Sequence, residues 1–121
     1  MGLCFQNSDG GFPETFPRDA SGCWTTAEIY AALSQWPDQN ASLSAQLGTA
    51  EEFLLGAFDL QGDGGLPYYS RSGSAGAVTS LSAVDPTAAF LSGWRMRHPE
   101  EGLIRGRLES WLRSARAAPE G

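Results

Sequence analysis

The sequence contains no lysine, one histidine and two cysteines, and it lacks any long apolar run. Without such a run there is no candidate for a membrane-spanning helix, which needs about 20 consecutive apolar residues. No signal-peptide core follows Met1, so the sequence predicts a cytoplasmic protein in which Cys4 and Cys23 are free thiols rather than a disulfide. The absence of lysine is typical of GC-rich bacterial coding and indicates no particular chemistry.

Positive charge is scarce and unevenly placed. The 121 residues carry a formal net charge of −6, which argues against a nucleic-acid partner. Residues 1–94 contain two arginines and ten acidic residues, whereas residues 95–121 contain six arginines and four acidic residues. The N-terminal part of the chain is therefore acidic, and its C-terminal end is basic.

The most informative feature that the sequence does contain is a repeated turn. The five residues 9–13, DGGFP, return 54 positions later as residues 63–67, DGGLP. Asp-Gly and Gly-Gly pairs favour a sharp turn, because glycine adopts positive φ at little cost, and the proline after them fixes an extended exit. The structural turns that this pattern predicts consist of Asp9, Gly10 and Gly11 and of Asp63, Gly64 and Gly65. Self-similarity of this kind predicts one structural unit present twice.

Four helices are predicted, two after each turn, from apolar residues that recur at helical period. They cover about residues 25–36, 43–60, 85–96 and 100–116. The predicted fold is therefore all-α. Two tandem αα-hairpins, at about residues 5–60 and 61–118, form a single domain over residues 1–121.

Helix starts are predicted from capping residues. Thr25 with Glu28, and Thr49 with Glu52, have the spacing of a capping box, in which each side chain satisfies a free backbone N–H. The second pair lies inside the second predicted helix, so it indicates a break near Gly48.

The second copy has the longer loop before its first helix. Thr26 corresponds to Thr87 at an offset of 61 rather than 54, so this loop is seven residues longer than the first. Residues 68–84 are rich in serine and glycine and predict a flexible surface loop. Asp85-Pro86 then predicts an N-cap with proline at the first helical position.

These segments resemble the αα-toroid repeats of protein prenyltransferase β-subunits and squalene-type terpene cyclases. The matching segments are residues 6–12, 22–25, 63–66 and 90–93. The resemblance implies that the helix after each loop lines the inside of a ring and the next helix its outside. The two hairpins would then form an arc of an αα-toroid. The candidate inner-face residues that it implies are Cys23, Trp24, Tyr30, Asp85 and Phe90.

The resemblance also implies where a catalytic zinc ion would bind. Prenyltransferases of this kind use an aspartate two residues before the cysteine that opens one inner helix, that cysteine, and a histidine that opens the next. Cys23 matches the cysteine, but Ser21 and Pro86 occupy the other two positions, with Asp19 and Asp85 as the nearby alternatives. A catalytic zinc site needs three protein ligands and an open position, so no zinc and no other cofactor are expected. The aspartate-rich DxDD motif of the cyclases is also absent.

Three other patterns carry weaker signals. Residues 59–64 imitate the first half of an EF-hand calcium loop, but the twelfth position is Ser70 rather than glutamate. His98 stands at a helix boundary with no evident acid or nucleophile nearby, so it is interpreted as a surface residue rather than a catalytic base. Tyr68 and Tyr69 lie beside the predicted loop, either packed under it or as a contact patch.

The function predicted from these observations is a non-catalytic module that acts through protein–protein contact, with a partner or by self-association. Two hairpins leave helical flanks without neighbours, and repeats of this kind bury their apolar faces only against one another. The candidate interface consists of Leu108, Trp111 and Leu112, with Leu3 and Phe5 at the other flank. The alternative is part of an isoprenoid enzyme whose other hairpins and catalytic groups come from another chain, with a small apolar ligand in the ring.

Overall fold

The computed structural model describes residues 6–13, 21–36, 40–68, 70–71, 78–79 and 81–117. Within these residues the helices are α1 (Cys23–Ser34), α2 (Ala41–Gln61), α3 (Val84–Arg97) and α4 (Leu103–Ala117). The strands are β1 (Leu66–Pro67), β2 (Ser70–Arg71), β3 (Val78–Thr79) and β4 (Ser82–Ala83). The predicted mainly helical class is confirmed. In this part of the chain none of the helices has the length and apolarity that crossing a membrane requires.

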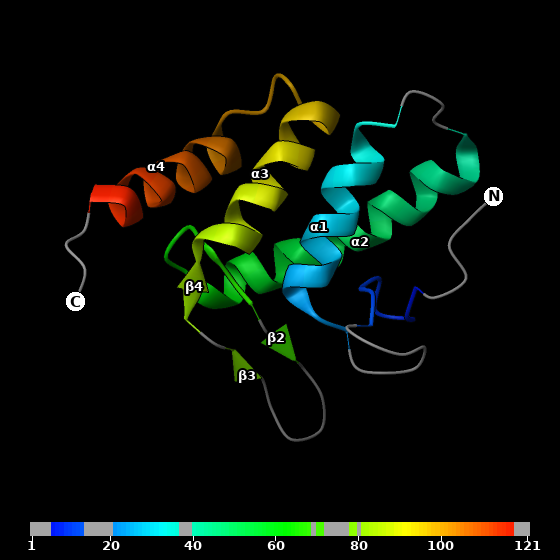
Figure 1. Cartoon of the computed structure of the whole chain (residues 1–121). Coiled ribbons are helices and arrows are strands. Elements are labelled where there is room, and N and C mark those ends of the chain that lie inside the picture. Colours follow the sequence, from blue (N-terminus) through cyan, green and yellow to red (C-terminus); the bar gives the residue numbers. More distant parts are fainter. Residues whose placement is uncertain are drawn as a thin grey trace.

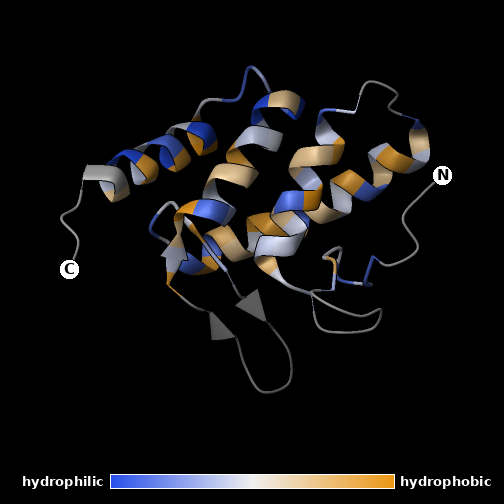
Figure 2. Cartoon of the chain, viewed as in Figure 1, coloured by the Kyte–Doolittle hydropathy of each residue, from blue (hydrophilic) through white to orange (hydrophobic). Residues whose placement is uncertain are grey.

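The two helices that follow the turns lie next to each other. α1 and α3 run side by side in the same direction, and α2 passes behind them (Figure 1). α2 packs on α1, and α4 packs on α3, so each half of the chain contributes one pair of contacting helices. Figure 2 shows hydrophilic and hydrophobic residues alternating along α4, as expected for a helix with one covered side.

The core lies where α1, α2 and α3 meet. Its largest fully buried side chains include Tyr30, Phe58, Phe90, Leu47, Leu54, Leu66 and Leu108. Burying a side chain of this size contributes about 1.5–3 kcal/mol. The rings of Tyr30 and Phe90 lie 5.6 Å apart across the α1–α3 contact. Gly93 allows this close approach, because a Cβ there would lie 2.5 Å from the Tyr30 ring.

The predicted capping box at the start of α1 is not formed. α1 begins at Cys23 with Gly22 as its N-cap and no side-chain cap, so Thr25 and Glu28 lie within its first turns. The helix ends at Ser34, two residues before the predicted end.

The predicted break in α2 is also absent. The helix runs without interruption from Asn40, whose side-chain oxygen caps it by accepting from the N–H of Leu43 at 2.8 Å. Thr49 does not cap a new helix start, because its hydroxyl donates to the carbonyl of Gln46 one turn earlier at 3.0 Å.

The helices of the second half begin at positions other than those predicted. α3 starts at Val84, so Asp85 lies in its first turn and Pro86 at its third position, where no intrahelical N–H bond is lost. α4 starts three residues later than expected. The carboxylate of Glu101 caps it by accepting from the backbone N–H groups of residues 103–105.

The stretch predicted as a flexible loop contains antiparallel strand pairing. β1 pairs with β4, with Pro67 opposite Ser82, and β2 pairs with β3, with Ser70 opposite Thr79. Residues 69, 72–77 and 80 lie outside the described part. In the first half the corresponding position holds an isolated bridge between residues 13 and 21.

Candidate functional site

The first turn is held by the side chain of Asp9. Its Oδ1 accepts from the backbone N–H of Gly11 at 2.9 Å and from the hydroxyl of Ser21 at 2.7 Å. The Asn7 side-chain amide donates to the same hydroxyl at 2.9 Å. The turn and the start of α1 are therefore joined by a network of side-chain hydrogen bonds.

The second turn has the same network. Oδ1 of Asp63 accepts from the N–H of Gly65 at 2.9 Å and from the hydroxyl of Ser82 at 2.8 Å. The Gln61 side-chain amide donates to the Ser82 hydroxyl at 2.8 Å. Each bond has its counterpart in the first half, so the sequence repeat is also a repeat of contacts.

A buried threonine connects each turn to the helix after it. Oγ1 of Thr26 accepts from the N–H that follows the first glycine pair at 2.9 Å, and it donates to the carbonyl four residues earlier at 2.7 Å. Oγ1 of Thr87 makes the same two bonds in the second half, both at 2.7 Å. The 61-residue offset between the halves thus relates equivalent positions of α1 and α3.

Replacing Thr87 with valine is expected to lower the free energy of unfolding by about 1–3 kcal/mol, because the buried N–H of Leu66 loses its acceptor. Thr25→Val, at a half-exposed position of α1, is the matched control and should change it by less than about 0.5 kcal/mol. Urea denaturation measures both variants. Equal losses would show that the hydroxyl of Thr87 contributes nothing particular to the turn.

The first turn packs closely against α2, and the second turn packs closely against α4. Gly10 and Gly64 have positive φ, 91° and 95°. A Cβ at Gly10 would lie 2.1 Å from the carbonyl oxygen of Thr49 in α2, and one at Gly64 would lie 2.9 Å from that of Arg107 in α4. These contacts make the turns structural connectors between helices.

Most of the predicted inner-face residues are covered. Cys23, Tyr30 and Phe90 are fully buried, so none of them lines an open cavity. Cys23 is a free thiol, and burial raises its pKa to about 12, which keeps it from the thiolate form that binds metals. The described residues contain no group of three His, Cys, Asp or Glu side chains placed to hold a metal ion. Cys4 and Asp19 lie outside the described residues.

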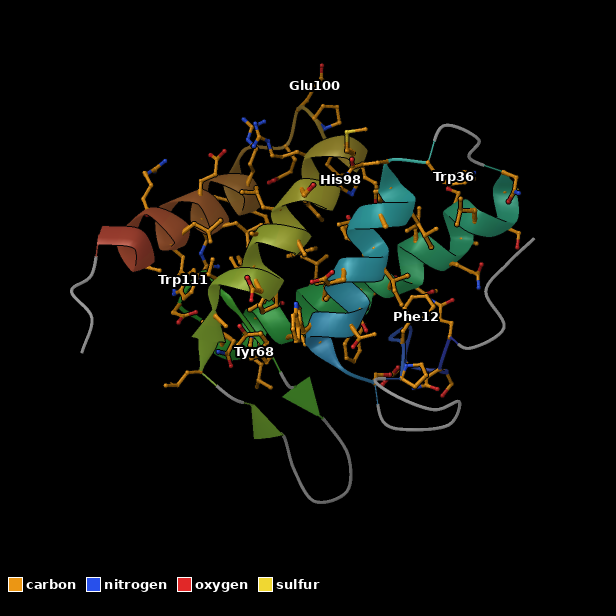
Figure 3. All side chains as sticks on the ribbon, viewed as in Figure 1. Phe12, Trp36, Tyr68, His98, Glu100 and Trp111 are labelled. Carbon is orange, nitrogen blue, oxygen red and sulfur yellow. The ribbon has the colours of Figure 1, made fainter. Side chains whose placement is uncertain are left out.

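The other two inner-face candidates, Trp24 and Asp85, are exposed and meet at Tyr68. The Trp24 ring packs edge-on against the Tyr68 ring with 4.9 Å between centroids. The Tyr68 hydroxyl donates to Asp85 at 3.0 Å, and this hydrogen bond raises the pKa of Tyr68. The three side chains lie at the N-terminal ends of α1 and α3 (Figure 3). Tyr69 lies outside the described residues.

The interface predicted on the last helix is only partly available. Leu108 is fully buried, because it packs into the core of its own chain, and it therefore cannot contact a partner. Trp111 and Leu112 are half-buried, and the Trp111 ring covers the second turn, 2.8 Å from where a Cβ of Gly65 would lie. Leu3 and Phe5, assigned to the other flank, lie outside the described residues.

A shallow groove runs along α4 beside Trp111. Its volume is about 440 Å³. Its walls are formed by Asp63, Gly102, Leu103, Gly106, Arg107, Ser110, Trp111 and Ser114. The guanidinium of Arg107 lies 4.7 Å above the Phe58 ring and donates to the Gly62 carbonyl at 3.2 Å, so this cation is held by its own chain.

A polar cluster that sequence reasoning missed joins three helices around Glu51. Its Oε1 accepts from the Tyr30 hydroxyl at 2.7 Å and from Nε of Arg97 at 3.0 Å, and it lies 2.7 Å from Nε2 of His98. Burial by itself would raise the pKa of Glu51, but the hydrogen bonds from Tyr30, His98 and Arg97 lower it below the usual carboxyl value. Because one oxygen serves three donors, the cluster ties α1, α2 and α3 together.

His98, which the sequence suggested to be a surface residue, is half-buried and has an acidic partner. Its acidic partner, Glu51, comes 47 residues earlier, and its ring stacks on Trp94 with 4.1 Å between centroids. One signal was present in the sequence. Glu51 falls on the apolar side of α2, between the buried Leu47 and Leu54, where a carboxylate requires partners.

Partly exposed apolar residues continue along α1 to just beyond its end. We define the leading face of α1 as Ile29 and Leu33 together with Trp36, which follows the C-cap residue Gln35. Ile29 and Leu33 are half-buried and pack against the core, and Trp36 is 57% exposed (Figure 3). At the equivalent positions 61 residues later, Phe90 packs on α1 and Arg97 binds α2. Trp36 is thus more exposed than its equivalent Arg97, which is half-buried.

Comparison of the chain with protein-family models, curated proteins and solved structures finds no match. What the chain does must therefore be inferred from its duplicated hairpins and from the surfaces that they leave uncovered.

Proposed function

We propose that the chain is a non-catalytic helical-repeat module that acts through contact with another protein surface. The observation that carries this proposal is the exposed indole of Trp36. It exposes 57% of its surface just beyond the end of α1, after the half-buried Ile29 and Leu33. A large exposed aromatic residue near aliphatic ones is typical of a protein–protein contact.

The module proposed is an arc of an αα-toroid. Three observations support it: the parallel neighbours α1 and α3, the antiparallel connection of each to its outer helix, and the two turns with matching hydrogen bonds (Figure 1). In a solenoid or ring of such hairpins each repeat contacts only its neighbours, so a terminal hairpin exposes an interior-type face.

The residues at the catalytic positions of the resembled family serve the fold instead. Ser21 binds Asp9 and so fixes the first turn, and Cys23 packs in the core. Pro86 is fully buried in the first turn of α3. These roles favour a binding module over an enzyme.

Replacing Trp36 with glutamate is expected to abolish association with the partner while leaving the fold intact. An exposed side chain contributes less than about 0.5 kcal/mol to folding, whereas an interface aromatic contributes about 2 kcal/mol or more to binding. Affinity capture from cells that express the tagged chain compares Trp36→Glu with Leu60→Glu, a matched control on α2 that is 50% exposed in the native chain. Loss of association in both variants, or in neither, would count against this face.

A second candidate function is supported by the aromatic pair at the N-terminal ends of the inner helices. Trp24 is 38% exposed and rests against Tyr68, so both rings could line the interior of a larger ring that acts on isoprenoid substrates. This function would be favoured if the captured partner supplies further hairpins and the complex turns over a prenyl diphosphate.

A further inference from the structure

We infer that Trp24, Tyr68 and Asp85 form a binding site for the guanidinium group of an arginine side chain on a partner protein. The site lies at the N-terminal end of α1, whereas Trp36 follows the C-terminal end, about 18 Å away at 1.5 Å per residue. The inference therefore goes beyond the proposed function and does not depend on the surface around Trp36.

Tyr68 is held in place by the first turns of both inner helices. Its backbone carbonyl accepts from the N–H of Trp24 at 3.0 Å, and its hydroxyl donates to Oδ2 of Asp85 at 3.0 Å. The residue is thus fixed at its backbone and at the tip of its side chain. A ligand that packs on a ring already held in this way loses little binding free energy to ordering it.

The rings of Trp24 and Tyr68 are placed to attract a cation. Their planes are inclined at 76° to each other, with 4.9 Å between centroids. Two rings at nearly a right angle form a corner that is bounded by a face of each, and aromatic faces attract cations within about 6 Å of the ring centroid. Trp24 is 38% exposed and Tyr68 is half-buried, so a ligand can reach both rings from solvent.

The carboxylate of Asp85 determines the charge of the ligand. The side chain is exposed, and Tyr68 is its hydrogen-bond partner among the described residues, which leaves Oδ1 available as an acceptor. Helix N-termini carry partial positive charge, which by itself would oppose a cation. The carboxylate in the first turn of α3 offsets this charge, and the Tyr68 carbonyl satisfies the N–H of Trp24 in α1.

This combination of groups favours guanidinium over ammonium. A guanidinium group is planar, so it can stack on an aromatic ring while its N–H groups donate to a carboxylate, whereas the ammonium group of lysine has no plane to stack. Residues 1–94, which include the site, hold ten acidic residues against two arginines, so the surrounding charge also attracts a basic partner.

Exposed apolar side chains near the site can contact the aliphatic part of the arginine. Leu81 is 89% exposed, and Val84, in the first turn of α3, is 51% exposed. Tyr68 directly follows β1 and Leu81 directly precedes β4, and these strands pair antiparallel, so both residues lie at the same end of the pair. The methylene groups of arginine pack on such side chains while the charged group reaches a carboxylate.

The test uses three peptides that differ only in the central residue: acetyl-Gly-Arg-Gly-amide and its counterparts with lysine and with citrulline, which has the shape of arginine without its charge. Two-dimensional proton–nitrogen NMR of the labelled chain follows the indole N–H of Trp24, which Trp24→Leu identifies. The arginine peptide is expected to move this signal with a Kd of about 1–10 mM. The lysine peptide should bind about threefold more weakly, and the citrulline peptide about tenfold or more.

Variants of the site are compared with a matched loss of charge elsewhere. Asp85→Asn should weaken binding of the arginine peptide about fivefold, and Trp24→Leu, followed through the backbone signals of α3, about two- to fivefold. Glu100→Gln removes the same charge beyond the far end of α3 (Figure 3) and should change the affinity by less than about 1.5-fold at physiological salt. Trp36→Glu, which tests the proposed function, should bind the peptide as the wild type does, so the two ideas can fail separately.

Three outcomes would overturn the inference. The citrulline peptide could bind as tightly as the arginine peptide, or Asp85→Asn and Glu100→Gln could have equal effects. If geranyl diphosphate moves the Trp24 signal and the arginine peptide does not, the aromatic pair is a site for an isoprenoid instead. The spread of the backbone signals shows whether each variant is folded. The peptide comparison needs only the wild type, so it decides the matter even if a variant does not fold.

Discussion

Replacing Gly10 with alanine is expected to lower the free energy of unfolding by about 2–4 kcal/mol, because two costs add. The residue has a φ of 91°, a left-handed conformation that strains a residue with a Cβ. The new methyl group would also lie 2.1 Å from the carbonyl oxygen of Thr49, so the turn would have to move away from α2. Urea denaturation with a two-state fit measures the change.

Gly48→Ala is the matched control for this prediction. Gly48 lies in the interior of α2, one residue from the carbonyl that Gly10 approaches, and a Cβ there would meet no atom within 4 Å. Alanine should stabilise the helix at this position by about 0.5–1 kcal/mol. The two substitutions are therefore expected to change the free energy of unfolding in opposite directions. A shared sign would mean that the first turn does not pack on α2 as described.

Replacing Glu51 with alanine is expected to cost about 3–5 kcal/mol, the usual range for removing one partner of a buried ion pair. The Glu51 side chain is 13% exposed, and its removal leaves the buried Tyr30 hydroxyl without an acceptor and Arg97 without its counter-charge. Glu52→Ala, at the exposed neighbouring position of α2, should change the free energy of unfolding by less than about 0.5 kcal/mol. If both variants lost similar amounts of free energy of unfolding, Glu51 would not link the three helices as described.

The contribution of Glu51 should also depend on pH, in a direction set by its lowered pKa. Because the folded chain holds this carboxylate more strongly than the unfolded chain does, its stabilisation is complete above the usual carboxyl pKa and is lost as the pH falls through the lowered one. The facing groups are Tyr30, Arg97 and His98. The difference in free energy of unfolding between the wild type and Glu51→Gln should therefore be largest near neutral pH and shrink below about pH 5. A difference that grows on acidification would contradict this assignment.

The sequence predicted the helices well because their apolar residues recur at helical period. α2 illustrates this, since Ala50, Leu54, Ala57 and Phe58 fall on its buried side. Helix starts were predicted poorly, because contacts with distant residues decide them. Thr26, rather than Thr25, anchors α1, since its hydroxyl accepts from the N–H of the turn before it. A local capping pattern carries no information about such a contact.

The strand pairing and the polar cluster depend on contacts between residues that are far apart in the sequence. A short motif does not predict such contacts. The serine- and glycine-rich composition of residues 68–84 predicts a loop. In the structure, β1 pairs with β4 and β2 pairs with β3, both antiparallel. Glu51 and His98 are 47 residues apart and meet only because α2 and α3 both pack on α1. The exposure of Trp36 was likewise not predicted, because apolar spacing does not reveal how far each side chain is buried.

The loops that precede α1 and α3 differ in length, but each is closed by a bridge between equivalent residues. Seven residues separate Pro13 from Ser21, and fourteen separate Pro67 from Ser82, yet each pair forms the same bridge, and both serines bind the aspartate of their turn. The second loop is thus seven residues longer than the first, and the helix that follows it still begins with the same contacts. Since longer loops add closure entropy only slowly, these two positions are where foreign peptides can be grafted into the repeat for protein engineering.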